Sequence, residues 1–121
     1  MALNGAGVTV FEALAAAEQL AAEGISARVI DCYSVKPVDV DTFRRALAET
    51  GLVVTVEDHW SEGGIGDAVL GALASTGELS GRVHKIAVTA MPGSGTPEEL
   101  RDWAGISATR IAATVRELLD A

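Results

Sequence analysis

The sequence predicts an α/β fold in which helices cover both faces of a largely parallel sheet. Strand-like and helix-like blocks alternate along the chain in the order β-α-β-α-β-α-β-α-α. Such alternation is typical of a parallel sheet, because parallel strands need a long crossover that is usually a helix. Residues 52–56 form a run of apolar and β-branched residues, as expected for a strand covered on both faces.

The chain of 121 residues is long enough for one domain with one core. We therefore expect a single domain over residues 1–121. The first predicted strand, at 2–6, is short, and later strands are predicted at 25–30, 52–56 and 82–89. We expect that this first strand is truncated, or that residues of another chain complete that edge of the sheet.

The first predicted helix, at 9–23, has a start signal and a stop signal. Thr9 and Glu12 predict a capping box, and Gly24 predicts the end of the helix. By helical spacing, the predicted inner face carries Val10, Leu14, Ala17 and Ala21.

The later helices also have boundary signals. Asp39 is expected to cap a second helix, which ends at Gly51. A third helix follows the turn at 61–64. Pro97 suits the first turn of a short fourth helix, and Ser107 suits the cap of the last one.

Charge excludes several classes of function. Seventeen acidic residues against nine Lys and Arg give a net charge of −8, and Lys36 and Lys85 are the only lysines. Nucleic acids and anionic membrane surfaces are therefore poor partners. No apolar run reaches the length of a membrane span. A single cysteine, Cys32, excludes an internal disulfide and a thiolate zinc cluster, which fits a reducing cytoplasm.

The best candidate for a site is the turn after the third strand. The residues concerned are Glu57, Asp58, His59, Trp60, Gly63, Gly64 and Gly66. Open α/β sheets place ligands at the carboxyl ends of strands. Glycines at a helix start expose backbone N–H groups that suit a phosphate or carboxylate, with His59 as an acid or base. The alternative is a strand-to-helix turn whose glycines serve backbone geometry and close packing.

Other residues give weaker signals. Metal binding within 57–62 is unfavourable, because consecutive strand residues point to opposite faces. His84 is interpreted as a packed or edge histidine, and Cys32 as a small packed residue. Trp60 and Trp103 are interpreted as core or interface anchors. No catalytic set emerges from these residues.

Four motifs occur in order along nearly the whole chain, at 5–14, 30–39, 54–66 and 92–106. Together they resemble the C-terminal domain of transketolase. The resemblance implies a three-layer α/β/α sandwich with a sheet of about five mostly parallel strands. It also implies the third of three domains, generally non-catalytic, in an enzyme that moves a ketol unit between sugar phosphates. Thiamine diphosphate and a divalent metal such as Mg²⁺ bind between the other two domains.

The family's thiamine diphosphate motif begins with Gly-Asp-Gly and ends in Asn. The nearest match here is Gly66-Asp67-Ala68, and Asn4 is the only asparagine. We therefore expect no catalytic, cofactor-binding or metal-binding residue in this chain. The resemblance implies that the turn from Glu57 to Gly66 faces thiamine-binding domains or subunits, in a homodimeric cytoplasmic enzyme of the pentose phosphate pathway.

Two related families also end with such a domain, namely the beta subunit of 2-oxo-acid dehydrogenases and 1-deoxyxylulose-5-phosphate synthase. They more usually carry a Glu-Glu pair where this chain has Glu57-Asp58-His59, which favours transketolase. A free-standing module that binds a small anion at 63–66, and a purely architectural dimer, remain alternatives. Docking onto other domains predicts an exposed apolar patch.

Overall fold

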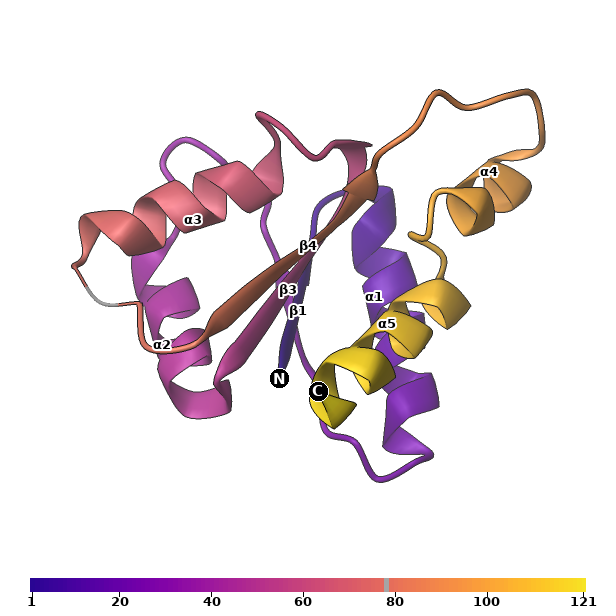
Figure 1. The fold of residues 1–121 in the computed structure, drawn as a ribbon. Helices are drawn as coiled ribbons and strands as arrows, with labels where there is room; N and C mark the ends of the chain where they lie inside the picture. The colour runs from indigo at the N-terminus through magenta and orange to yellow at the C-terminus, as the bar shows by residue number, and fades with distance from the viewer. Residues whose placement is uncertain (78) are drawn as a thin grey trace.

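The computed structural model describes residues 1–77 and 79–121. One sheet contains four strands, all parallel, in the order β2-β1-β3-β4 (Figure 1). The strands are β1 (Ala2–Gly5), β2 (Arg28–Asp31), β3 (Leu52–Trp60) and β4 (Arg82–Val88). The predicted α/β class is confirmed. The described residues form four strands rather than five, and none of these is antiparallel.

Helices cover both faces of the sheet and so give three layers. They are α1 (Val8–Ala21), α2 (Val40–Thr50), α3 (Ile65–Ser75), α4 (Pro97–Trp103) and α5 (Ala108–Asp120). Helices α1 and α5 pack together on one face, and α2 and α3 on the other (Figure 1). Helix α4 lies beyond the end of β4 and has no buried residue. Among the described residues, no helix is both long enough and apolar enough to cross a membrane.

The strand β3 divides the core into two halves. Val54 and Val56 lie in the core under α1 and α5, whereas Val53 lies in the core with α2 and α3. Successive strand residues point to opposite faces, so a strand between two helical layers must be apolar on both sides. The apolar run in the sequence therefore predicted this strand correctly.

The short first strand lies inside the sheet. Ala2 pairs with Arg28 of β2 and also with Val53 of β3, and all four residues of β1 are buried. The edges of the sheet are β2 and β4. Because β1 is not an edge strand, it offers no edge for another chain to complete.

Most helix boundaries agree with the sequence signals. Asp39 accepts a hydrogen bond from the Thr42 backbone N–H at 3.2 Å, and α2 ends at Gly51 with a φ of 73°. Thr96 forms a capping box at the start of α4, which Pro97 opens. Ser107 caps α5. These caps are short-range interactions, which explains why they could be predicted.

The predicted capping box of the first helix is wrong. Gly7 is the N-cap residue of α1 and contributes no side chain. The Thr9 hydroxyl instead accepts a bond from the Ala6 N–H at 2.9 Å. The Glu12 carboxylate reaches across to the Ala108 N–H of α5 at 2.8 Å. Glu12 thus binds the start of a distant helix, α5, and not the start of its own helix.

The predicted inner face of α1 is also wrong. The side chains that are buried in this helix are Thr9, Ala13, Ala16 and Leu20. Leu14, which we placed inside, is 47% exposed. Alanines occur all round the helix, so apolar spacing alone does not select one face. Small side chains at Ala13 and Ala16 let α1 pack closely on the sheet.

Candidate functional site

The candidate turn lies at the carboxyl end of β3, as the sequence predicts. The strand continues past its predicted end at Val56 to Trp60, and its pairing with β4 becomes irregular between these two residues. Glu57 is 1% exposed, while Asp58, His59 and Trp60 are exposed. At its carboxyl end, β3 therefore carries one buried carboxylate and three accessible side chains.

The Glu57 carboxylate occupies the N-terminus of α3. Its Oε1 accepts a hydrogen bond from the Ile65 N–H at 2.8 Å, and its Oε2 accepts one from the Gly66 N–H at 2.9 Å. These N–H groups have no partner within the helix, and the helix dipole favours a negative charge there. The anion that this helix start attracts is thus supplied by the chain itself.

The glycines of the turn have identifiable packing roles. A Cβ atom at Gly64 would lie 1.6 Å from Glu57 Oε1, and one at Gly66 would lie 2.4 Å from Lys85 Cδ. Gly63 has a φ of 79°, which L side chains rarely adopt. This geometry favours the strand-to-helix turn over an open anion site, although binding at the turn itself stays a prediction.

Lys85 of β4 binds the same turn through a hydrogen bond and an ion pair. Its Nζ donates to Asp67 Oδ1 at 2.7 Å and to the Ser61 carbonyl at 2.8 Å. Asp67 also accepts from the Gly63 N–H at 2.7 Å. The bond from Lys85, and then the one from Gly63, hold the pKa of Asp67 below its ordinary value of 3.8. The bond to Asp67 raises the pKa of Lys85 above 10.5.

Sequence reasoning missed both residues of this ion pair, Lys85 and Asp67. Lys85 lies on β4 between His84 and the apolar residues Ile86, Ala87 and Val88, and a half-buried lysine on a strand is a signal for a specific ion pair. In the sequence analysis Asp67 appears only in Gly66-Asp67-Ala68, the incomplete match to the thiamine diphosphate motif. Its place in the first turn of α3 is typical of an acidic residue that interacts with a helix start.

His59 lies beside Glu57, but Asp58 does not join them. The His59 Nδ1 atom is 2.8 Å from the Trp60 carbonyl oxygen and 3.9 Å from Glu57 Oε1. Asp58 instead lines a groove near α4. The three consecutive residues therefore do not converge on a single point, as strand geometry predicts.

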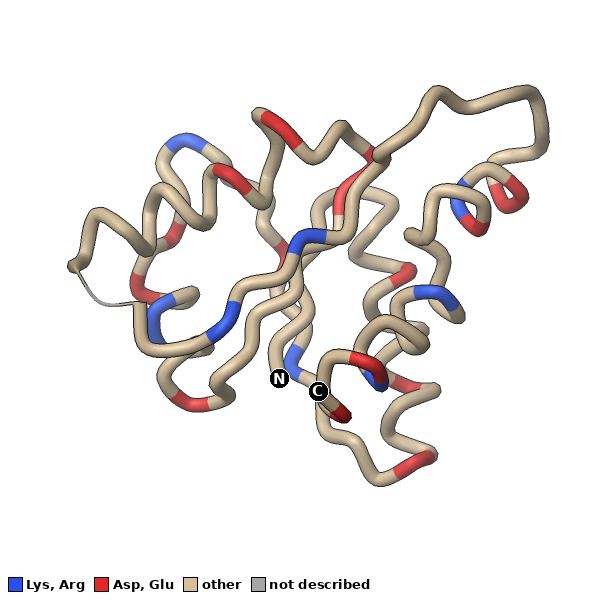
Figure 2. Tube along the Cα trace, in the orientation of Figure 1, with Lys and Arg blue, Asp and Glu red and all other residues tan. Residues whose placement is uncertain are grey.

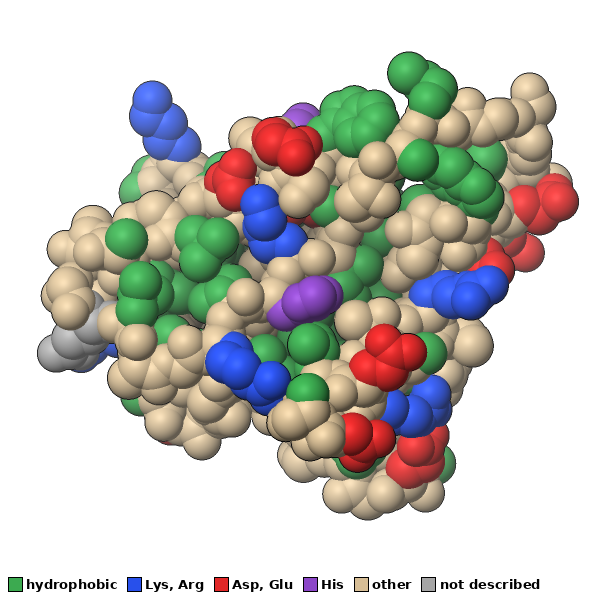
Figure 3. Space-filling model, in the orientation of Figure 1, with side chains coloured by type: hydrophobic (Ala, Val, Ile, Leu, Met, Phe, Trp, Pro, Cys, Tyr) green, Lys and Arg blue, Asp and Glu red, His purple; other side chains and the backbone are tan. Residues whose placement is uncertain are grey.

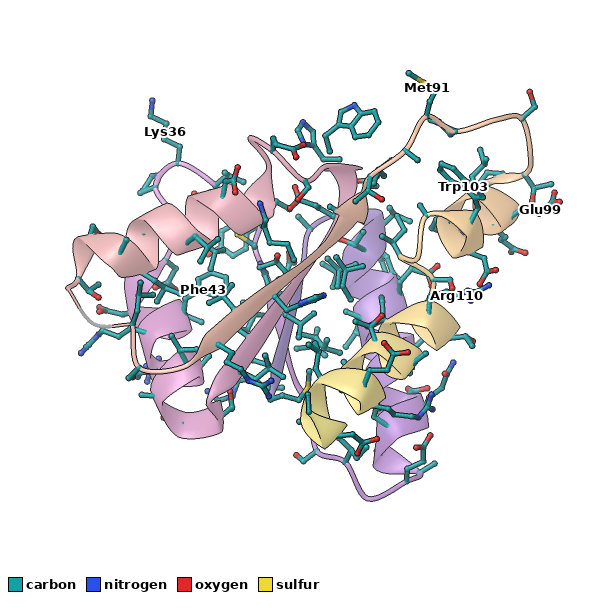
Figure 4. All side chains as sticks on the ribbon, viewed as in Figure 1. Lys36, Phe43, Met91, Glu99, Trp103 and Arg110 are labelled. Atoms are coloured by element: carbon teal, nitrogen blue, oxygen red, sulfur yellow. The ribbon has the colours of Figure 1, made fainter. Side chains whose placement is uncertain are left out.

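That groove has a volume of about 180 Å³ and is mostly apolar. Its lining residues are Asp58, Val88, Pro92, Leu100, Arg101, Trp103, Ala104 and Ile106. Figure 3 shows apolar side chains gathered over this region, and Figure 4 shows Met91 on the loop before α4 and Trp103 on α4, both at the upper right. Trp60, Met91 and Trp103 are 43%, 79% and 50% exposed. Both tryptophans thus lie at the surface, which excludes the core interpretation.

A larger cavity of about 420 Å³ lies beside the loop that follows β2. Cys32, Tyr33 and Phe43 are among its lining residues. Burial, and then the nearby Asp31 charge, raises the pKa of the Cys32 thiol. A thiol that stays protonated is a weak nucleophile, so Cys32 acts as the small packed residue that the sequence predicts.

Comparisons with known proteins agree on one family. Residues 1–111 match the family described as "Transketolase, C-terminal domain". The chain is 49% identical over 114 residues to transketolase-like protein 2 of Mus musculus, and 47% identical over 119 residues to transketolase of Homo sapiens. The matches cover 93% and 95% of this chain but 18% of each relative. The chain thus spans about a fifth of their length.

Two solved structures have a similar fold. A split gene transketolase, described as an inactive beta4 tetramer, superposes with a TM-score of 0.87 at 37% identity. The match covers 96% of this chain and 38% of the other chain. Transketolase of Campylobacter jejuni gives a TM-score of 0.63 at 18% identity, over 96% of this chain and 16% of the other. This second likeness concerns the fold alone.

Proposed function

This chain belongs to the transketolase C-terminal domain family, and we propose that it is a non-catalytic domain or subunit of a thiamine-diphosphate-dependent transketolase. In that role it supports assembly or regulation of the enzyme. The reaction is the transfer of a ketol group between sugar phosphates. The thiamine diphosphate and its divalent metal, which supply that chemistry, belong to the other domains.

One observation carries the assembly role. Trp60, Met91 and Trp103 are exposed in the part of the chain that follows the ends of β3 and β4, and Trp103 lines the apolar groove beside α4. Monomeric proteins seldom expose contiguous apolar patches unless these bind a partner. Trp60 and Trp103 suit an interface, because a large aromatic ring buries much area at little cost in conformational entropy. We propose that this surface docks onto the thiamine-binding part of the enzyme.

The turn after β3 does not fit the diphosphate of the cofactor. A diphosphate needs free N–H groups or cations, but the Ile65 and Gly66 N–H groups are bonded to Glu57. Lys85 is engaged by Asp67. Within residues 1–77 and 79–121, no cluster of three or more His, Cys, Asp or Glu side chains could hold a metal ion. We therefore derive no step of the reaction through this chain.

The same geometry weighs against the free-standing anion module, because the buried Glu57 would repel an added anion at the turn. The C-terminal part of a related thiamine enzyme stays an alternative. The proposed partners are the thiamine-binding domains or subunits, within a homodimeric enzyme. We place that enzyme in the cytoplasm and in the pentose phosphate pathway.

A native pull-down of this domain from its source cells tests the proposal. We expect its peptides to come from a chain of three-domain size, or from a small chain held by thiamine-binding subunits. A free protein of this size without a thiamine-binding companion would overturn it. In parallel, calorimetric titration of the isolated chain with thiamine diphosphate and Mg²⁺ should give no binding heat.

A further inference from the structure

Two polar side chains in the core have no hydrogen-bond partner among the protein atoms that the structure describes. They belong to Asn4 of β1 and Thr55 of β3, and both residues are 0% exposed. The atoms concerned are Asn4 Nδ2, Asn4 Oδ1 and Thr55 Oγ1. Such buried groups are rare in folded proteins, because the hydrogen bonds that they lose to bulk water must be replaced inside. These three atoms therefore call for a partner.

Asn4 and Thr55 are neighbours on one face of the sheet. They are paired directly in the parallel register of β1 and β3. Ala2 and Val53, each two residues earlier, lie in the core with α2 and α3, and strand residues two apart share a face. A Cβ atom at Gly66 would lie 2.9 Å from Thr55 Oγ1, so this hydroxyl faces the first turn of α3. Neighbouring strands are about 4.8 Å apart, a spacing that one small molecule can bridge.

The chemistry of the three atoms selects the kind of molecule that fits. Asn4 Nδ2 only donates hydrogen bonds, Asn4 Oδ1 only accepts them, and Thr55 Oγ1 does both. A cation offers no acceptor to Nδ2, and an anion offers no donor to Oδ1. A water molecule donates and accepts, and buried waters typically bind about three polar groups that lack another partner.

The charged side chains next to this position have partners of their own. Glu57 follows Thr55 by two residues on β3 and accepts two backbone N–H bonds at the start of α3. Lys85 is paired with Thr55 in the register of β4, and its Nζ donates to Asp67. None of the four residues of β1, all of which the structure describes, is charged (Figure 2). The position between Asn4 and Thr55 thus suits a neutral ligand.

We propose that Asn4 and Thr55 bind one internal water molecule between β1, β3 and the first turn of α3. The water forms one hydrogen bond with the Asn4 side-chain amide and one with Thr55 Oγ1. It thereby connects the two central strands of the sheet, which share only three paired positions along the backbone. This inference does not depend on the proposed function.

A high-resolution crystal structure of the 121-residue chain tests the inference. We expect density for one enclosed water within about 2.7–3.2 Å of Thr55 Oγ1 and of one polar atom of the Asn4 side chain. Thr55→Ser is the matched control, because serine keeps the hydroxyl, and its structure should contain the same water. A direct hydrogen bond between Asn4 and Thr55 in the parent chain, or bonds from both to other protein groups, would overturn the inference.

Thermal unfolding of variants gives an independent readout. Thr55→Val and Asn4→Leu keep the approximate shape of each side chain and remove its polar atoms. Each should lower the melting temperature by roughly 3–8 °C, because the water and the remaining side chain lose a partner. The double variant removes every polar atom of the site together with the water, so its loss should be smaller than the sum of the two single losses. Additive losses would show that the two side chains share no water.

Discussion

The Glu57 carboxylate fills the space that a side chain at Gly64 would need. A Cβ atom there would lie 1.6 Å from Glu57 Oε1 and 2.8 Å from Glu57 Cδ. The carboxylate cannot simply move aside, because the Ile65 and Gly66 N–H groups bind its two oxygens. The glycine and the glutamate therefore form one structural unit at the start of α3.

Gly64→Ala should destabilise the domain by displacing this carboxylate. We expect a loss of about 1–3 kcal/mol or more in the free energy of unfolding, as for other overpacked sites. Gly71→Ala on the same helix is the control, since nothing lies within 4 Å of a Cβ there. It should stabilise the domain by about 0.5–1 kcal/mol through helix propensity. Urea unfolding of both variants measures these changes, and equal stability of the two would contradict the packing argument.

Glu57→Ala should leave two N–H donors at the start of α3 without their acceptor. Hydrogen bonds to charged groups contribute about 1.5–3 kcal/mol each, so we expect the loss of two such bonds to lower the unfolding free energy by about 3–6 kcal/mol. Asp58→Ala, exposed and one residue further on, should stay within about 0.5 kcal/mol of the parent.

Added acetate provides a second readout for Glu57→Ala. If the helix start binds anions, acetate should raise the melting temperature of this variant more than that of the parent chain. Identical responses to acetate and to matched chloride would show that the buried carboxylate acts by packing alone.

The sequence predicts the order of elements well, because apolar periodicity and caps are local signals. Asp39, Gly51 and Ser107 each act within a few residues of the backbone group they serve. Glu12 and Glu57 instead satisfy N–H groups that are distant in sequence. Local spacing cannot reveal such partners. The sequence thus located the candidate turn but not the internal carboxylate that occupies the start of α3, and anion binding at the turn stays a prediction.

The ion pair between Asp67 and Lys85 should make the folding stability of the domain depend on pH. The bond from Lys85 lowers the pKa of Asp67 from its ordinary 3.8. A carboxyl with a lower pKa in the folded state stabilises it above the unfolded pKa, and this stabilisation is lost as pH falls through the folded value. Lys85 has a raised pKa, so its contribution is present below 10.5 and is lost as pH rises through the folded value.

Asp67→Asn should therefore lower the melting temperature near neutral pH and make it fall less steeply below about pH 4. Melting curves between pH 2 and 7 by circular dichroism, roughly one per half unit, measure this difference. Asp120→Asn, at the exposed end of α5, controls for the loss of one charge. If the melting temperature of Asp67→Asn changes with pH in parallel with that of the parent chain, the ion pair with Lys85 contributes nothing to folding stability.

Glu12 should stabilise the contact between α1 and the C-terminal helices. One carboxylate oxygen accepts from the Ala108 N–H at 2.8 Å, and the other lies 3.0 Å from Arg101 Nε. Removing a helix cap costs about 0.5–2 kcal/mol, so Glu12→Ala should lose about that much unfolding free energy. Hydrogen exchange should rise first at the start of α5, where Ala108 donates to Glu12, and in the last turn of α4, which holds Arg101. Glu18→Ala, exposed on the same helix, should leave both measurements unchanged. Loss of stability without faster exchange in α5 would assign the effect to α1 itself and contradict the tertiary cap.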